Sequence, residues 1–261
     1  MSTSLHSKSG PCLRRSKDPL RSSSPLACDD KAKPTTLPRR AQVRDSYECV
    51  VDFRKKPFSI VWRKSLPFLD LPQFPIVRDA EVFPIEQSLD TATIWRNSTL
   101  LGYGSFASIR VEKNDGFPVL RLPHSDKRSS QLIRHEFTML ADLRVRGVPV
   151  PETYLQPVTD DGGICGYRME VLLSLDTGEL HSRSSDIEQA LIQLHSAGFV
   201  HGDISPNNIM KDKDDNIILI DFGISGRIGD QVLDLFPTRL YPSGIFTAST
   251  DWEAWNKYLQ K

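Results

Sequence analysis

Residues 199–223 constrain this 261-residue chain more than any other part of its sequence. They hold two aspartates, Asp203 and Asp221, that stand 18 positions apart, and Asn208 follows the first by five positions. Short apolar runs on either side of a polar, Asp-rich turn at residues 211–216 predict a β-hairpin between Asn208 and Asp221. Such a hairpin brings these two residues together, where two oxygen ligands can share a hard cation. Asp203 would lie on the preceding loop, where its carboxylate can accept a hydroxyl proton.

Two motifs in this stretch resemble the catalytic core of the protein-kinase superfamily. His201-Gly202-Asp203, with Asn208, is similar to the H-x-D-x-x-x-x-N catalytic loop, and Asp221-Phe222-Gly223 is similar to the D-F-G motif. Found in this order and at this interval, the pair is far more specific than either motif alone. The resemblance implies an α+β, two-lobed fold with a β-rich N-lobe and a short helical C-lobe. In the alternative interpretation Asp203 caps a helix and Asp221 lies in a turn.

A glycine-containing segment about one hundred residues earlier extends the resemblance. Strands predicted at residues 94–101 and 107–112 flank Gly102-Tyr103-Gly104-Ser105-Phe106. A hairpin tip with two glycines lets backbone N–H groups approach phosphate oxygens closely. The tip resembles the kinase Gly-rich loop, with Ala107 at the position of the third glycine and Ile109 where a valine usually covers adenine. An ordinary hairpin turn is the alternative for so short a motif.

The strand predicted at residues 117–122 departs from the kinase pattern. Val119-Leu120-Arg121 resembles the V-A-I-K sequence, but Arg121 stands where the family has the lysine that holds the phosphates. The exchange is not conservative, because the planar guanidinium is bulkier than an ammonium and is hydrated differently. The resemblance implies that Arg121 pairs with Glu136, on a helix predicted at residues 129–146. The alternatives are a surface role for Glu136 and Lys113 as a substitute phosphate ligand.

Three further segments fit the same family. Residues 169–172 resemble the hinge between the kinase lobes, whose backbone at Glu170 and Leu172 would bind the adenine edge. A helix predicted at residues 186–197 leads into His201, and Asp251, on a last predicted helix, is similar to the aspartate that braces the kinase catalytic loop. Only 38 residues follow Gly223, so we expect a C-lobe that is either minimal or truncated.

The form of the catalytic loop indicates an atypical branch. Gly202 stands where ordinary eukaryotic protein kinases have arginine, and Ser205 stands where they often have lysine. These residues are more similar to RIO-type kinases, small-molecule phosphotransferases and fungal kinase-like proteins.

The resemblance also implies a reaction and its cofactors. ATP and Mg²⁺ would serve as cofactors, with Asp203, Asn208 and Asp221 as catalytic residues and the last two as metal ligands. A Ser or Thr hydroxyl of a protein is the expected acceptor, ahead of a small molecule. The alternative is a pseudokinase that binds nucleotide or a partner, which Arg121 and the short C-lobe favour.

Composition divides the chain into three parts. Residues 1–45 lack aromatics, hold eight Ser and five Pro, and carry ten Lys/Arg against four Asp/Glu, which predicts a disordered basic tail. Residues 46–92 are rich in aromatics and prolines, with short strands predicted at 48–53 and 58–62. They predict an extended arm that docks on a neighbouring surface, either of its own domain or of a protein partner. Residues 93–261 form the predicted kinase-like domain.

The remaining composition bears on partners and location. A formal net charge of zero does not support nucleic acid as a partner. The four cysteines, at positions 12, 28, 49 and 165, lack metal-ligand spacing, and free thiols in a reducing compartment are the simplest interpretation. No apolar run is long enough to span a bilayer, and the N-terminus lacks the apolar core of a secretory signal. Together these features predict an intracellular protein of the cytoplasm or the nucleus.

Overall fold

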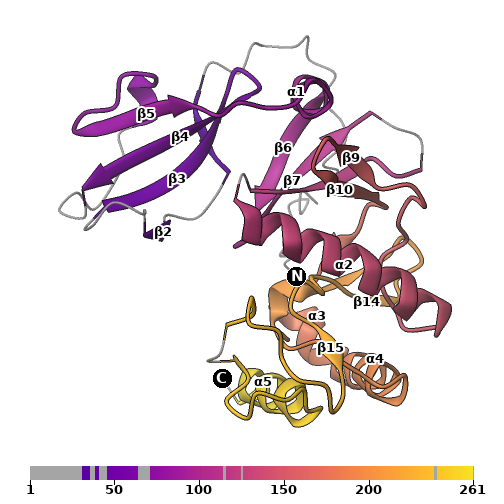
Figure 1. Cartoon of the computed structure of the whole chain (residues 1–261). Coiled ribbons are helices and arrows are strands. Elements are labelled where there is room, and N and C mark those ends of the chain that lie inside the picture. The colour runs from indigo at the N-terminus through magenta and orange to yellow at the C-terminus, as the bar shows by residue number, and fades with distance from the viewer. Residues whose placement is uncertain are drawn as a thin grey trace, which may run out of the picture.

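The computed structural model describes residues 31–35, 39–40, 46–63, 71–113, 116–124, 126–237 and 240–260. A β-rich N-lobe lies above a C-lobe that carries three helices, and a further sheet lies beside the N-lobe (Figure 1). The expected α+β, two-lobed fold is thereby confirmed. Most of the predicted basic tail, at residues 1–30, 36–38 and 41–45, lies outside the described residues.

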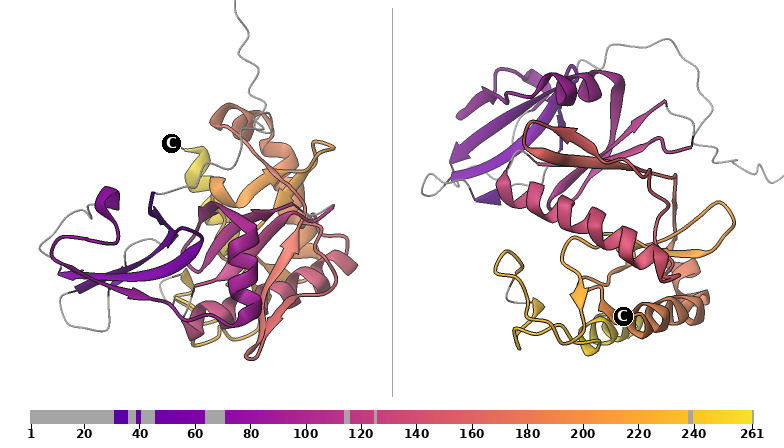
Figure 2. Two further views of the ribbon diagram at one scale, coloured as in Figure 1. Left: turned by 90° about the horizontal axis from the view of Figure 1, so that it is seen from above. Right: turned by 45° about the vertical axis from the view of Figure 1, so that its right-hand side comes forward.

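The N-lobe is built on an antiparallel sheet in the strand order β6-β7-β8-β10-β9. Its strands are β6 (Ser98–Tyr103), β7 (Ala107–Glu112), β8 (Val119–Pro123), β9 (Val158–Asp160) and β10 (Gly163–Met169). Helix α2 (Lys127–Val145) runs along this lobe and packs on β8 and β10 (Figure 2). It contributes Ile133, Leu140 and Leu143 to the main core, at the spacing of one helical face. Asp126 caps the helix by accepting the N–H of Ser129 at 2.9 Å.

The N-lobe also contains a helix that the sequence did not predict. Residues 94–97 were expected to begin a strand, but they close helix α1 (Leu89–Asn97), so that prediction is wrong. Ser88 starts the helix by accepting the N–H of Thr91, and Asp90 lies in the first turn, where a negative charge stabilises the helix dipole. Burial of Trp95 then fixes the helix against the sheet.

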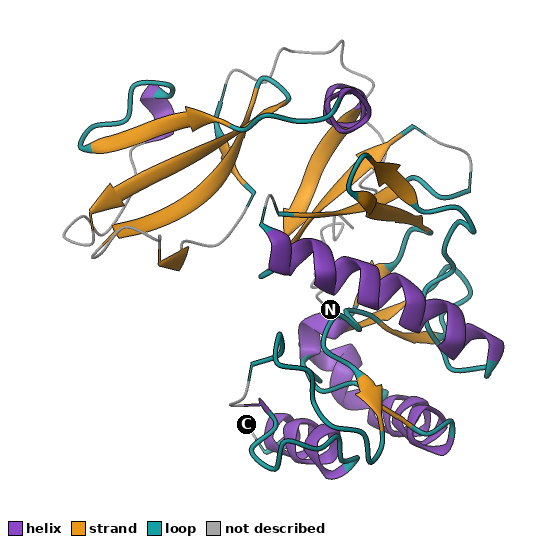
Figure 3. Cartoon of the chain, viewed as in Figure 1, coloured by secondary structure: helices purple, strands orange, loops and turns teal. Residues whose placement is uncertain are grey.

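A second sheet, hereafter the N-terminal sheet, lies beside the N-lobe (Figure 3). Its strands are β1 (Lys33–Pro34), β2 (Arg39–Arg40), β3 (Ser46–Phe53), β4 (Lys56–Arg63) and β5 (Ala80–Pro84), and η1 (Leu71–Gln73) precedes β5. A two-residue turn at Arg54 and Lys55, both with positive φ, joins β3 to β4. Aromatic residues of this segment pack in a core of their own, which includes Trp62 and Phe74. Docking of residues 46–92 on a partner stays a prediction.

The C-lobe surrounds the predicted catalytic stretch. Its helices are α3 (Thr177–Ser182), α4 (Ser184–Ser196) and α5 (Ser249–Leu259). Its strands form two small sheets: β11 (Leu173–Ser174) with β13 (Ile209–Lys211) and β14 (Ile217–Leu219), and β12 (Phe199–Val200) with β15 (Gly226–Arg227). A short 3-10 helix, η2 (Pro206–Asn208), precedes β13. Across the described ranges, the structure contains no helix with the length and apolar character needed to cross a membrane.

Candidate active site

A buried carboxylate on α5 accepts hydrogen bonds from the backbone of the loop from His201 to Asp203. Asp251 is fully buried, and its Oδ1 and Oδ2 accept the backbone N–H groups of Gly202 at 2.7 Å and His201 at 2.8 Å. His195, on α4, approaches the same carboxylate, with its Nε2 2.9 Å from Oδ2. Hydrogen bonds to a charged acceptor are among the stronger ones in proteins, so α5 fixes the backbone that presents Asp203.

His201 joins this loop to the second aspartate motif. Its Nδ1 accepts the N–H of Asp203 at 3.2 Å, so the ring proton lies on Nε2, which donates to the carbonyl of Ile220 at 2.8 Å. The ring also packs on Phe222, with centroids 4.6 Å apart. Asp203 itself lies exposed at the end of this braced loop.

The hairpin predicted between Asn208 and Asp221 is confirmed, because β13 and β14 pair with Ile209 opposite Leu219. The N–H of Ile220 extends this pairing by donating to the carbonyl of Asn208 at 3.0 Å, which brings Asn208 beside Asp221. The side-chain amide of Asn208 donates to the carbonyl of Asp203 at 2.7 Å. The structure therefore brings together Asp203, Asn208 and Asp221.

Arg121 enters the same region from β8 and pairs with two carboxylates. Its Nε lies 2.8 Å from Oε2 of Glu136, and its Nη2 donates to Oδ1 of Asp221 at 2.5 Å. Glu136 is fully buried on α2, and its Oε1 accepts the N–H of Phe222 at 3.1 Å. Strand β8, helix α2 and the D-F-G segment thus meet at one guanidinium. Lys113 is exposed beyond the end of β7, away from this cluster.

Burial dominates the electrostatics of this cluster. Desolvation raises the pKa of Glu136 to about 7, although the charge of Arg121 and hydrogen bonds from Tyr167 and Phe222 lower it. The pKa of Arg121 is raised above its ordinary value because Asp221 and Glu136 both stabilise the cation against desolvation. Tyr167, buried on β10, was not identified from the sequence, because its hydrogen bond to Glu136 depends on how α2 crosses the sheet.

The side chains present fit a hard cation bound together with phosphates. The amide nitrogen of Asn208 is committed to the carbonyl of Asp203, which leaves its Oδ1 as the ligand atom beside Asp221. An amide and a carboxylate oxygen suit Mg²⁺, which usually keeps few protein ligands and completes its shell with phosphates and water. Within the described residues, no three His, Cys, Asp or Glu side chains form a group that could hold a metal ion.

The predicted nucleotide-contacting residues lie on the sheet edge and the hinge. Gly102, Tyr103, Gly104, Ser105 and Phe106 connect β6 to β7, and the N–H of Gly104 donates to Ala107 at 2.8 Å. Ile109 is paired with Arg121 across β7 and β8. At the hinge, Glu170 exchanges hydrogen bonds with Glu152, and Leu172 is half-buried against the main core.

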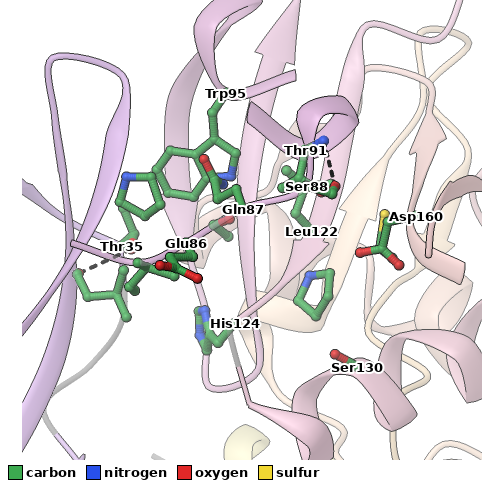
Figure 4. Close-up of a pocket in the computed structure, with 16 residues that line it drawn as sticks. Thr35, Glu86, Gln87, Ser88, Thr91, Trp95, Leu122, His124, Ser130 and Asp160 are labelled. Carbon is green, nitrogen blue, oxygen red and sulfur yellow. Dashed lines mark hydrogen bonds between the residues drawn. The ribbon is translucent and has the colours of Figure 1, made fainter. Parts of the chain in front are cut away.

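A separate cavity of about 240 Å³ lies between the N-terminal sheet, α1 and the N-lobe sheet (Figure 4). Thr35, Trp95, Leu122 and His124 are among the residues that line it. His124 Nε2 also contacts the carbonyl of Gly104 at 3.0 Å, which connects this cavity to the glycine-containing loop. The cavity is lined by none of the residues that the sequence predicted for the site.

Comparison with known proteins places these motifs in a family context. Residues 167–243 match the model of the protein kinase domain. Over 135 residues the chain is 33% identical to a probable bifunctional tRNA threonylcarbamoyladenosine biosynthesis protein of Natronomonas pharaonis, covering 51% of this chain and 24% of that protein.

Two eukaryotic kinases are similar over nearly the same length. A probable serine/threonine-protein kinase of Dictyostelium discoideum is 29% identical over 136 residues, covering 48% of this chain and 10% of the kinase. A serine/threonine-protein kinase of Schizosaccharomyces pombe is 27% identical over 149 residues, covering 51% of this chain and 47% of the kinase. In all three cases the match spans less than half of the relative's own length.

Proposed function

We propose that this chain, a member of the protein-kinase-like superfamily, is an atypical ATP-dependent phosphotransferase that transfers the γ-phosphate to a hydroxyl group. The proposed acceptor is a Ser or Thr side chain of a protein, in keeping with the names of the two eukaryotic relatives. An intracellular location is proposed with it.

One observation carries this proposal: the side chain of Asn208 bonds the carbonyl of Asp203, the β13–β14 hairpin brings Asn208 beside Asp221, and Asp251 bonds the backbone that precedes Asp203. Bracing a loop with a fully buried carboxylate is costly unless its hydrogen bonds are made, and here both oxygens of Asp251 are used. A binding module that performs no chemistry does not need this arrangement.

The chemistry follows from the positions of these groups. The exposed carboxylate of Asp203 would orient the acceptor hydroxyl and accept its proton. Asn208 and Asp221 would hold Mg²⁺, which when bound neutralises phosphate charge. Arg121 would stabilise the phosphate oxygens, and the loop at residues 102–106 would cover them with backbone N–H groups. Positioning and charge stabilisation therefore supply most of the catalysis.

A pseudokinase is the second candidate, and the contact between Arg121 and Asp221 favours it. At 2.5 Å the guanidinium occupies one oxygen of the carboxylate that would hold the metal. Because a guanidinium stays protonated at every accessible pH, this contact is not released by titration of Arg121. In a pseudokinase this contact would be permanent, whereas in an enzyme Asp221 would give it up to hold the metal.

Turnover of ATP by the purified chain separates the two candidates. With Mg²⁺ and a panel of protein and small-molecule acceptors, we expect slow transfer that Asp203→Asn lowers by about a hundredfold or more, since the base is lost. Asp214→Asn, a matched change of an exposed aspartate in the β13–β14 turn, should leave the rate unchanged. A folded wild-type protein that transfers no phosphate to any acceptor would establish the pseudokinase instead.

A further inference from the structure

Gly202 faces a side chain that leaves no room for any other residue at its position. A Cβ atom added there would lie 1.5 Å from the hydroxyl oxygen of Tyr241 and 2.6 Å from its Cζ. The backbone φ of Gly202 is +82°, which is the left-handed region that glycine adopts at little cost. The phenol of Tyr241 therefore occupies the volume that a side chain on the catalytic loop would fill.

Tyr241 uses its hydroxyl to bond the backbone on the other side of the site. The Oη donates to the carbonyl of Ile224, the residue after Gly223, at 2.6 Å. The side chain is only 3% exposed, and its ring packs edge-on against Phe246 with centroids 4.9 Å apart. It belongs to a second core of the C-lobe that also contains Val200, which leads into His201.

The phenol also stays a neutral donor. Burial raises the pKa of Tyr241 well above its ordinary value of 10.0, and the carboxylates of Asp251 and Asp203 raise it further. The hydroxyl therefore keeps its proton over the physiological pH range.

We propose that Tyr241 is a positioning residue, which links the backbone after Gly223 to the backbone before Asp203 and so keeps the two aspartate motifs in register for phosphotransfer. This inference rests on the proposed function. The link needs no added charge, because one neutral hydrogen bond to Ile224 and the packing of the phenol against Gly202 make it.

The test is Tyr241→Phe, which keeps the ring packing and removes only the hydroxyl. We expect kcat to fall by about fivefold or more with KM for ATP changed by less than about twofold, since a buried carbonyl loses its donor while the nucleotide contacts stay. Tyr258→Phe is the matched control: this α5 tyrosine has a buried hydroxyl for which the described residues provide no hydrogen-bond partner. It should leave kcat unchanged.

Amide hydrogen exchange tests the link that Tyr241 makes between Gly202 and Ile224 without relying on catalytic activity. Amides in residues 224–237 and 240–246 should exchange faster in Tyr241→Phe than in wild type. A folded Tyr241→Phe protein with kcat within about twofold of wild type would overturn the positioning role. If wild type itself has no turnover, the proposed function fails, and the exchange comparison alone then decides whether Tyr241 links the two segments.

Discussion

Two buried arginines on neighbouring strands show how this chain uses one side chain in two ways. Arg110, on β7, pairs with Leu120 across the sheet, and Arg121, on β8, pairs with Ile109, so the two arginines lie on opposite faces. Arg110 is 0% exposed and Arg121 is 9% exposed. Both guanidiniums are desolvated, and only their partners distinguish them.

Arg110 has one carboxylate partner, and its remaining contacts are with a serine and a tryptophan. Its Nη2 bonds Asp52 of the N-terminal sheet at 2.8 Å, its Nε bonds Ser98 at 2.7 Å, and its guanidinium stacks on Trp95 at 4.0 Å. Desolvation lowers the pKa of Arg110, and the charge of Asp52 partly restores it. This arginine therefore joins the N-terminal sheet, through Asp52, to the strand that follows the glycine-containing loop.

Arg121, by contrast, is shared between Glu136 and Asp221, so the cluster carries more negative than positive charge whenever Glu136 is ionised. An excess of negative charge favours an added cation, whereas the neutral pair of Arg110 and Asp52 has no such demand. A buried ion pair of equal and opposite charges therefore stabilises the contact between two parts of the fold. A guanidinium divided between two carboxylates can serve a site whose contacts change during a reaction.

The largest expected effect is on the balanced pair. Asp52→Asn should lower the free energy of unfolding by about 3 kcal/mol, because it leaves a buried guanidinium that cannot neutralise itself by losing a proton. Urea unfolding would measure it. Asp79→Asn is the control, since Asp79 pairs with Arg78 on the surface of the same segment, where both side chains are exposed. It should cost less than about 1 kcal/mol. An equal loss in free energy of unfolding for the two variants would contradict the proposal that the pair of Asp52 and Arg110 stabilises the contact between the two sheets.

A smaller loss of stability, with a distinctive pH dependence, is expected for Arg121→Met. The remaining Glu136 can take up a proton, so the cost should be about 1–2 kcal/mol below neutral pH, less than for Asp52→Asn. In wild type, the folded state binds this proton more tightly than the unfolded state, so the contribution of Glu136 to stability falls as pH rises from 4.5 to about 7.

Removing Arg121 raises the pKa of Glu136 further, so the fall should continue above pH 7 in the variant. Urea unfolding between about pH 7 and 9 should show the difference between variant and wild type growing by up to about 1.4 kcal/mol per pH unit. A difference that stays constant over this range would show that Arg121 does not control the protonation of Glu136.

The smallest expected effect concerns the contact between Arg121 and Asp221. Nucleotide should stabilise the wild-type fold more with Mg²⁺ than without it, and Asp221→Asn should remove this difference. Arg121→Lys should tighten Mg²⁺-dependent nucleotide binding by about threefold, because an ammonium is a single point charge that does not bond both carboxylates as the planar guanidinium does.

Thermal-shift titrations with ATP would measure these affinities. Arg134→Lys is the matched control, because Arg134 lies on α2 but bonds the carbonyl of Ile164 on the surface. Identical Mg²⁺ dependence in wild type and Asp221→Asn would remove Asp221 from the metal site. Weaker Mg²⁺-dependent binding in Arg121→Lys would show that the arginine supports nucleotide binding rather than competing with the metal.

Much of the site's local architecture was accessible from the sequence. The hairpin that joins Asn208 to Asp221 follows from two apolar runs around a polar turn, and the structure shows it. The pairing of Arg121 with Glu136 was implied by the family resemblance and is present. The end of helix α1, residues 94–97, was mistaken for the start of a strand because this short, β-branched sequence carries little periodic signal, and the helix caps and the burial of Trp95 outweigh that composition.

The local sequence predicted the candidate catalytic residues, because a motif, a strand and a turn each consist of residues that are close together in the chain. Packing between distant segments decided the rest. It placed Tyr241 in the space that Gly202 leaves and joined Asp52 to Arg110. No sequence period encodes such contacts, since they depend on which buried polar groups meet once the helices and sheets are assembled. Their energies arise only in that desolvated interior.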